Sequence, residues 1–179
     1  MDLREHKRVF ILFYMVGFFF GIIYANTFFK DYTYSLGIFS DYFITQYSQT
    51  EINTGRYLFY LMRIRLLTMI LIFGLGLTKV RTITVWVFLI WTGFLCGIIL
   101  CSATMRLGIW GIIYVCLSLF PHMICYVFAY YILVCNIYAY PTAKWDGAKI
   151  FIIIAVMLMG IIMECRLNPM LIKMFLKTV

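Results

Sequence analysis

Five long apolar runs, each bounded by charged or turn-forming residues, dominate the hydrophobic pattern of the chain. They cover residues 9–29, 57–77, 82–102, 108–134 and 149–163. A helix of about 20 apolar residues crosses the hydrocarbon core of a bilayer, and it satisfies its own backbone polar groups where no water can do so. The pattern therefore predicts an all-helical, polytopic membrane protein with about five transmembrane helices, forming a single integral membrane domain over residues 1–179.

The fourth run is long for one span, and it contains Pro121 near its middle. Proline removes an intrahelical hydrogen bond, so we expect the fourth helix to be broken there. His122 follows directly and would lie inside the membrane. It could relay a proton or bind a ligand, but we favour a neutral histidine that hydrogen-bonds a carbonyl group left without its donor by the proline.

Small residues recur four positions apart in two of the runs. Gly93 and Gly97 form a G-x-x-x-G pair, and Gly17, Gly21 and Ala25 repeat the spacing in the first run. Small residues at this spacing let two helices approach closely. We interpret both stretches as helix-packing surfaces, and association with a second copy of the chain stays open.

The longest connection, residues 30–56, has a pattern of its own. Its apolar residues Leu36, Phe39, Phe43 and Tyr47 follow one another at spacings of three and four, with polar residues between them. This is typical of an amphipathic helix lying in the membrane interface. Phe39 and Phe43 are therefore candidate contact residues for a partner or the membrane surface.

Three charged residues lie in or beside the apolar runs: Arg63, Arg65 and Glu164. They could serve an anionic substrate or an ion path, but pairing is the more ordinary role of such charges. The second and fifth helices run in opposite directions, which brings all three residues to a similar depth. The two arginines lie roughly 200° apart around a helix. We therefore expect only one of them to pair with Glu164, while the other extends to lipid headgroups or meets another partner.

Composition excludes most soluble classes. Hydrophobic residues make up 65% of the chain and charged residues only 12%, with a mean hydropathy of +0.98, which lies outside the range of soluble globular proteins. The net charge of +8 resides largely in short connections, so membrane lipids are the expected partner and nucleic acid is not.

The sequence offers no pattern typical of a catalytic or metal site. The six cysteines form no C-x-x-C pair, the chain has only two histidines, and phosphate-loop and nucleophile-elbow motifs are absent. We expect buried thiols, no metal, no cofactor and no enzymatic activity. The basic N-terminus and the basic turn at Lys79 and Arg81 favour a cytoplasmic N-terminus in a multi-pass protein of the cell membrane.

Several short motifs occur in an order that resembles the stage II sporulation protein M family of bacterial polytopic membrane proteins. They are GIIYAN (21–26), FGLG (73–76), GFLCG (93–97), GIWG (108–111), PH (121–122) and ECRLNP (164–169). The last motif resembles the family's acidic residue followed by a proline, here Glu164, Asn168 and Pro169. Where many relatives carry a glycine and then a glutamate after the Pro-His pair, this chain has Met123 and Tyr126.

The resemblance implies a five-span protein that works through partners. The sporulation member is a non-enzymatic scaffold that anchors peptidoglycan-remodelling enzymes, an amidase and a lytic transglycosylase, in the septal membrane during forespore engulfment. Other relatives accompany ATPases in systems that export peptides or give immunity to them. The expected function is therefore a membrane scaffold for cell-wall hydrolases, and the alternative is a permease-like subunit of an ATPase-coupled system.

Overall fold

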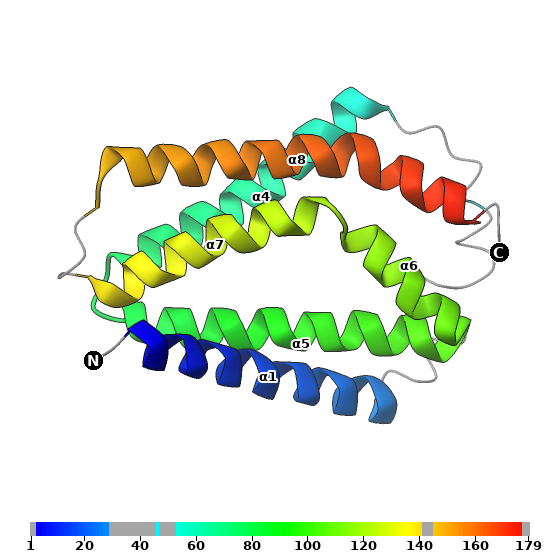
Figure 1. The fold of residues 1–179 in the computed structure, drawn as a ribbon, viewed down its shortest axis with the longest axis horizontal. Coiled ribbons are helices and arrows are strands. Elements are labelled where there is room, and N and C mark those ends of the chain that lie inside the picture. The colour runs from blue at the N-terminus through cyan, green and yellow to red at the C-terminus, as the bar shows by residue number, and fades with distance from the viewer. Residues whose placement is uncertain (1–2, 29–45, 47–52, 141–144, 177–179) are drawn as a thin grey trace. The chain divides into compact units, whose positions relative to one another are not determined.

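The structure, a computed structural model, describes residues 3–28, 46, 53–140 and 145–176. Helices are the regular elements of this described part (Figure 1), and no strand occurs in it, which confirms the predicted all-helical class. They are α1 (Leu3–Thr27), α4 (Thr54–Gly76), α5 (Arg81–Leu107), α6 (Ile109–Leu119), α7 (His122–Ala139) and α8 (Gly147–Leu176). The predicted amphipathic helix with Phe39 and Phe43 lies outside the described residues.

Five of these helices, α1, α4, α5, α7 and α8, are long and apolar enough to cross a membrane. Their surfaces expose large apolar side chains, among them Phe20, Phe59 and Phe151. A water-soluble protein rarely leaves so much apolar surface uncovered, whereas lipid chains solvate it readily. The chain is therefore a helical polytopic membrane protein, as the apolar runs predict.

The chain forms two compact units. Unit 1 comprises Met1–Thr50 and Trp86–Cys116, and unit 2 comprises Glu51–Val85 and Leu117–Val179. Unit 1 accordingly contains α1, most of α5 and most of α6. Unit 2 contains α4, the first residues of α5, α7 and α8.

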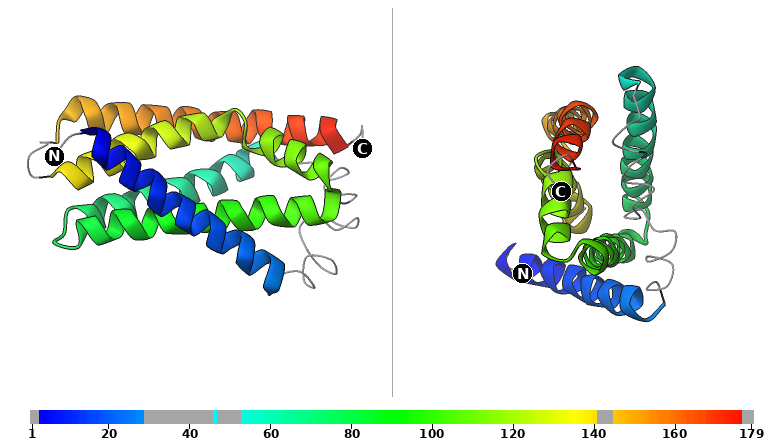
Figure 2. Two further views of the ribbon diagram at one scale, coloured as in Figure 1. Left: turned by 60° about the horizontal axis from the view of Figure 1, so that its bottom comes forward. Right: turned by 90° about the vertical axis from the view of Figure 1, so that its right-hand side faces the viewer.

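In unit 1, α1 lies against α5 (Figures 1 and 2). Glycines on both helices form the contact. Gly17 and Gly21 of α1 face α5, and Gly93 and Gly97 of α5 face α1 in return. A Cβ atom on any of them would collide with a backbone carbonyl oxygen of the other helix, those of Ile90, Phe94, Tyr14 and Phe18 respectively. Both small-residue stretches are thus packing surfaces, as predicted.

The same contact continues along most of α1. At one end Phe13 stacks on Trp86 with ring centroids 5.0 Å apart, and at the other the Asn26 amide donates a hydrogen bond to Cys101 Sγ at 3.2 Å. Contact positions increase together along both helices, so α1 and α5 run parallel. Residues 13 to 26 correspond to roughly 20 Å of helix.

A glycine turn reverses the chain after α5. Gly108 has a φ of 59°, in the left-handed region that glycine enters without steric cost. One turn later Gly111 packs on the backbone of Ala103, where a Cβ would collide with the carbonyl oxygen. The start of α6 therefore folds back against the end of α5.

In unit 2, α7, α8 and α4 contact one another (Figure 1). Their buried side chains are mainly apolar. Leu133 and Ile137 of α7 and Met157 and Ile161 of α8 have almost fully buried side chains. Gly76 of α4 makes room for the Ile137 side chain, which a Cβ there would displace.

The predicted break at Pro121 is confirmed. Helix α6 ends at Leu119 and α7 begins at His122, with a cis peptide bond between Phe120 and Pro121. The run predicted over 108–134 is therefore two helices, and α7 extends to Ala139. Asn136 is accommodated near the end of α7 because its amide donates to the Ile132 carbonyl and accepts a hydrogen bond from Lys149 Nζ.

The fifth helix is longer than predicted. The sequence predicts a span over residues 149–163, whereas α8 continues through Pro169 to Leu176. An interior proline costs about 3 kcal/mol in an isolated helix. Here Ile172 and Phe175, both beyond the proline, are buried, and their packing keeps the segment helical.

Candidate functional site

Unit 2 contains an ion pair between two of its membrane-spanning helices. Arg65 of α4 donates two hydrogen bonds to Glu164 of α8, from Nη2 to Oε1 at 2.6 Å and from Nε to Oε2 at 3.1 Å. Two parallel bonds between guanidinium and carboxylate fix both distance and orientation. The predicted pairing of Glu164 with one of the two arginines is confirmed, and the partner is Arg65.

Burial differs between the two partners. The Glu164 side chain is 7% exposed and the Arg65 side chain 36%, so the carboxylate is enclosed while the guanidinium reaches it from the edge of the core. A charge inside a membrane protein is costly unless it is paired. Arg63 lies on the exposed side of α4, as expected for the arginine that does not turn inward.

Tyr126 of α7 completes the cluster. Its hydroxyl donates a hydrogen bond to Glu164 Oε2 at 2.6 Å, and the Arg65 guanidinium carbon lies 4.9 Å from the centre of its ring. A cation over an aromatic face is attracted by the ring quadrupole. Tyr126 therefore contacts both members of the ion pair, and the three residues tie α4, α7 and α8 together.

Gly160 makes the position of Tyr126 possible. It lies one turn before Glu164 on α8, and a Cβ atom on it would approach the Tyr126 ring to 2.8 Å. The sequence did not point to either residue as part of this cluster, and Tyr126 was noticed only as a difference from the pattern of the resembled family. The available signal was the four-residue spacing between Gly160 and Glu164, which puts a small residue beside the carboxylate on one helix face.

His122 is buried beside this cluster, with 2% of its surface exposed. Its ring meets Tyr126 edge to face, with centroids 5.7 Å apart. Nδ1 has no hydrogen-bond partner within the part of the chain that the structure describes. The expected bond to a proline-freed carbonyl is therefore not made by this nitrogen, and the contact with Tyr126 accounts for the position of the ring.

The arrangement holds helices together and leaves little capacity for chemistry at Glu164. Among the described residues, Oε2 accepts bonds from Arg65 and Tyr126, and Oε1 accepts the second bond from Arg65. No group of three or more His, Cys, Asp or Glu side chains in the described ranges could hold a metal ion. A carboxylate occupied in this way fits a structural clamp better than a proton carrier.

The remaining candidate residues that the structure describes form no hydrogen bond with this cluster, whereas Phe39 and Phe43 lie outside the described residues. Gly93 and Gly97 form the α1–α5 contact of unit 1, and Pro121 separates α6 from α7. Asn168 and Pro169 lie in the continuous α8, where Asn168 Oδ1 is buried with no hydrogen-bond partner among the described residues.

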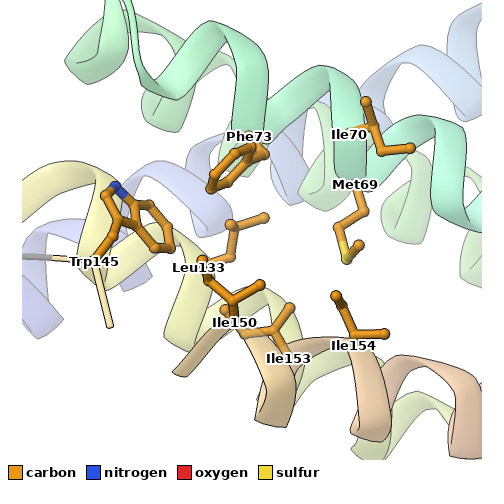
Figure 3. A pocket seen from close by; sticks show the side chains of 8 residues that line it. All are labelled: Met69, Ile70, Phe73, Leu133, Trp145, Ile150, Ile153 and Ile154. Atoms are coloured by element: carbon orange, nitrogen blue, oxygen red, sulfur yellow. The ribbon is translucent and has the colours of Figure 1, made fainter. Parts of the chain in front are cut away.

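A cavity of about 190 Å³ lies elsewhere in unit 2 and has a purely apolar lining (Figure 3). It is bounded by side chains of α4, α7 and α8 and by Trp145: Met69, Ile70, Phe73, Leu133, Trp145, Ile150, Ile153 and Ile154. Phe73 and Trp145 meet edge to face at one end, with centroids 4.9 Å apart. These side chains provide no group for acid–base or nucleophilic chemistry, so the cavity suits apolar material only.

Comparison with known proteins identifies no relative, because no family model, no curated protein and no solved structure matches the chain.

Proposed function

We propose that this protein is a non-enzymatic membrane scaffold whose helices hold a fixed arrangement while other regions recruit partners. The observation that carries the proposal is the Arg65–Glu164–Tyr126 cluster, in which the buried carboxylate is bound by a partly exposed guanidinium and by a tyrosine hydroxyl. Charges that stay paired in this way hold the helices in a fixed arrangement, which is what a scaffold requires.

The order of the motifs resembles the stage II sporulation protein M family, and this resemblance indicates which kind of partner to expect. On that resemblance, the chain recruits peptidoglycan-remodelling enzymes to a bacterial membrane. Phe39 and Phe43 in the long connection are the proposed contact residues, because the sequence pattern places them on one apolar helix face.

The test is co-purification of enzymatic activity with the tagged, full-length chain from its own host in mild detergent. Eluates are assayed for peptidoglycan hydrolysis in a zymogram and for ATP hydrolysis. We expect hydrolase activity in the eluate, and we expect its loss when Phe39 and Phe43 are both changed to Glu. The matched control changes both residues to Leu, which preserves the apolar face and should retain the activity.

Co-elution of ATPase activity without hydrolase activity contradicts the scaffold proposal. That result supports the alternative, a permease-like subunit of an ATPase-coupled export or immunity system.

A further inference from the structure

The apolar cavity of unit 2 lies between two helices that are long and apolar enough to cross a membrane. Figure 3 shows side chains of α4 on one side of it and side chains of α8 on the other, with Leu133 of α7 and Trp145 completing the lining. A cavity with a purely apolar lining stays dry, because a water molecule inside it finds no hydrogen-bond partner. Such a cavity takes up apolar molecules instead.

The cavity opens at the outer surface of α4 and α8. Its inner wall includes two buried side chains, Leu133 and Ile153. Its rim includes Ile70 and Ile154, which are 62% and 39% exposed. The outer surface of a membrane-spanning helix contacts lipid tails, which are as apolar as these side chains. The cavity is therefore continuous with the lipid-facing surface of unit 2.

The position of the cavity along α8 indicates how deep it lies in the membrane. Trp145 stands just before α8, as is typical of the membrane–water interface, and its ring meets Phe73 at one end of the cavity. Ile150 and Ile154 lie three and seven residues after Gly147, the first residue of α8, or about 5–10 Å along the helix. One leaflet of the hydrocarbon core is about 15 Å thick. The cavity thus lies within a single leaflet, level with the middle of a lipid tail.

We propose that this cavity binds the middle of one acyl tail of a membrane phospholipid. Three features agree on this occupant, because the lining is apolar, the opening faces the tails and the depth matches their middle. An apolar cavity of about 150 Å³ takes up benzene, so a cavity of about 190 Å³ holds roughly eight carbon atoms of a tail. The bound tail packs between α4 and α8 and stabilises their contact.

Photolabelling in a bilayer tests the proposal. The full chain is reconstituted into phosphatidylcholine vesicles that contain phosphatidylcholine with a diazirine in the middle of one tail. After illumination, labelled residues are located by mass spectrometry. We expect labelling of Leu133 and Ile153, because these buried side chains are out of reach of tails that only surround the protein. Phe151, exposed on α8, reports the surrounding tails and should also be labelled.

Blocking the opening of the cavity should remove the inner labels. Ile154→Trp places a larger side chain at the rim and should abolish labelling of Leu133, while Phe151 stays labelled. The matched control is Ile152→Trp, because Ile152 is 44% exposed on the same helix and does not line the cavity. This control should keep the label at Leu133.

A second pair of variants on α4 keeps the test decisive if an α8 variant does not fold. Ile70→Trp should act like Ile154→Trp, and Leu71→Trp is its control, because Leu71 is exposed but does not line the cavity. Labelling of Phe151 without Leu133 in the unaltered chain would overturn the proposal, as would a Leu133 label that survives both rim variants or is lost equally in their controls. An alkane carrying the same diazirine that labels Leu133 when the phospholipid does not would assign the cavity to free apolar molecules and likewise overturn it.

Discussion

Glu164 accepts three hydrogen bonds from Arg65 and Tyr126, which come from two different helices. The sequence predicts that this carboxylate pairs with an arginine at similar depth, because both helix directions and residue spacings are readable from the apolar runs. It does not predict which arginine, since rotation of α4 about its axis is set by packing. It also does not predict Tyr126, whose contact depends on the close approach of α7 to α8.

Removing the Tyr126 hydroxyl should measure its contribution directly. We expect Tyr126→Phe to lower the free energy of unfolding by about 1.5–3 kcal/mol, the usual range for a hydrogen bond to a charged group. Thermal unfolding in mild detergent is the measurement. Tyr131→Phe is the matched control, because Tyr131 lies on the same helix with 42% of its surface exposed. Equal melting temperatures for Tyr126→Phe and the wild type would contradict the role assigned to this hydroxyl.

A glycine-to-alanine substitution is expected to have opposite effects on stability at Gly160 and at Gly74. Gly160→Ala should destabilise the protein by about 1–3 kcal/mol, because the new methyl group forces the Tyr126 ring away from Glu164. Gly74→Ala should stabilise it by about 0.5–1 kcal/mol, because nothing lies within 4 Å of the added Cβ and alanine favours a helix. If both substitutions shift the melting temperature in the same direction, the absence of a Cβ at Gly160 is not what makes room for the Tyr126 ring.

At the level of elements, the contact between α1 and α5 depends on backbone proximity at four glycines. The Asn26 side chain touches Cys101 Sγ, so Asn26→Cys should form a disulfide with Cys101 under mild oxidation. Adding Gly21→Ile should prevent it, because the larger side chain collides with the Phe94 backbone and separates the helices. Gel mobility with and without reductant, after proteolysis between the helices, reports the cross-link.

The control for this cross-link is Asn26→Cys combined with Cys101→Ser, which should show none. Persistence of the disulfide in the Gly21→Ile variant would mean that α1 and α5 do not need the glycine contact.

The presence of the membrane-spanning helices could be predicted from the sequence. The residues at which the helices end were harder to predict. The break at Pro121 follows from local chemistry, because proline lacks the N–H that a continuous helix needs. The same rule fails at Pro169, where burial of Ile172 and Phe175 outweighs the lost bond. Local rules therefore hold where tertiary packing does not oppose them.

At the scale of the whole molecule, five of the described helices are long and apolar enough to cross a membrane. We predict that all five cross it, which puts the start of α1 and the end of α8 on opposite sides. We predict a cytoplasmic N-terminus and an extracytoplasmic C-terminus from the basic residues at the start of the chain and at Lys79 and Arg81. A reporter active only in the cytoplasm should work when fused before Met1 and fail when fused after Val179. Activity in both fusions would contradict five spans, and the reverse pattern would invert the orientation.

We assign the Arg65–Glu164 pair a structural role, in which it holds α4 and α8 together. A charge-reversal cycle tests this assignment most directly. Arg65→Glu and Glu164→Arg should each reduce stability, towards the lower end of about 3–5 kcal/mol because Arg65 is a third exposed. We predict that the doubly reversed chain regains most of its melting temperature and the proposed recruitment of peptidoglycan hydrolase activity. A doubly reversed chain that is stable but recruits no hydrolase would contradict the account and assign a functional role to the Glu164 carboxylate itself.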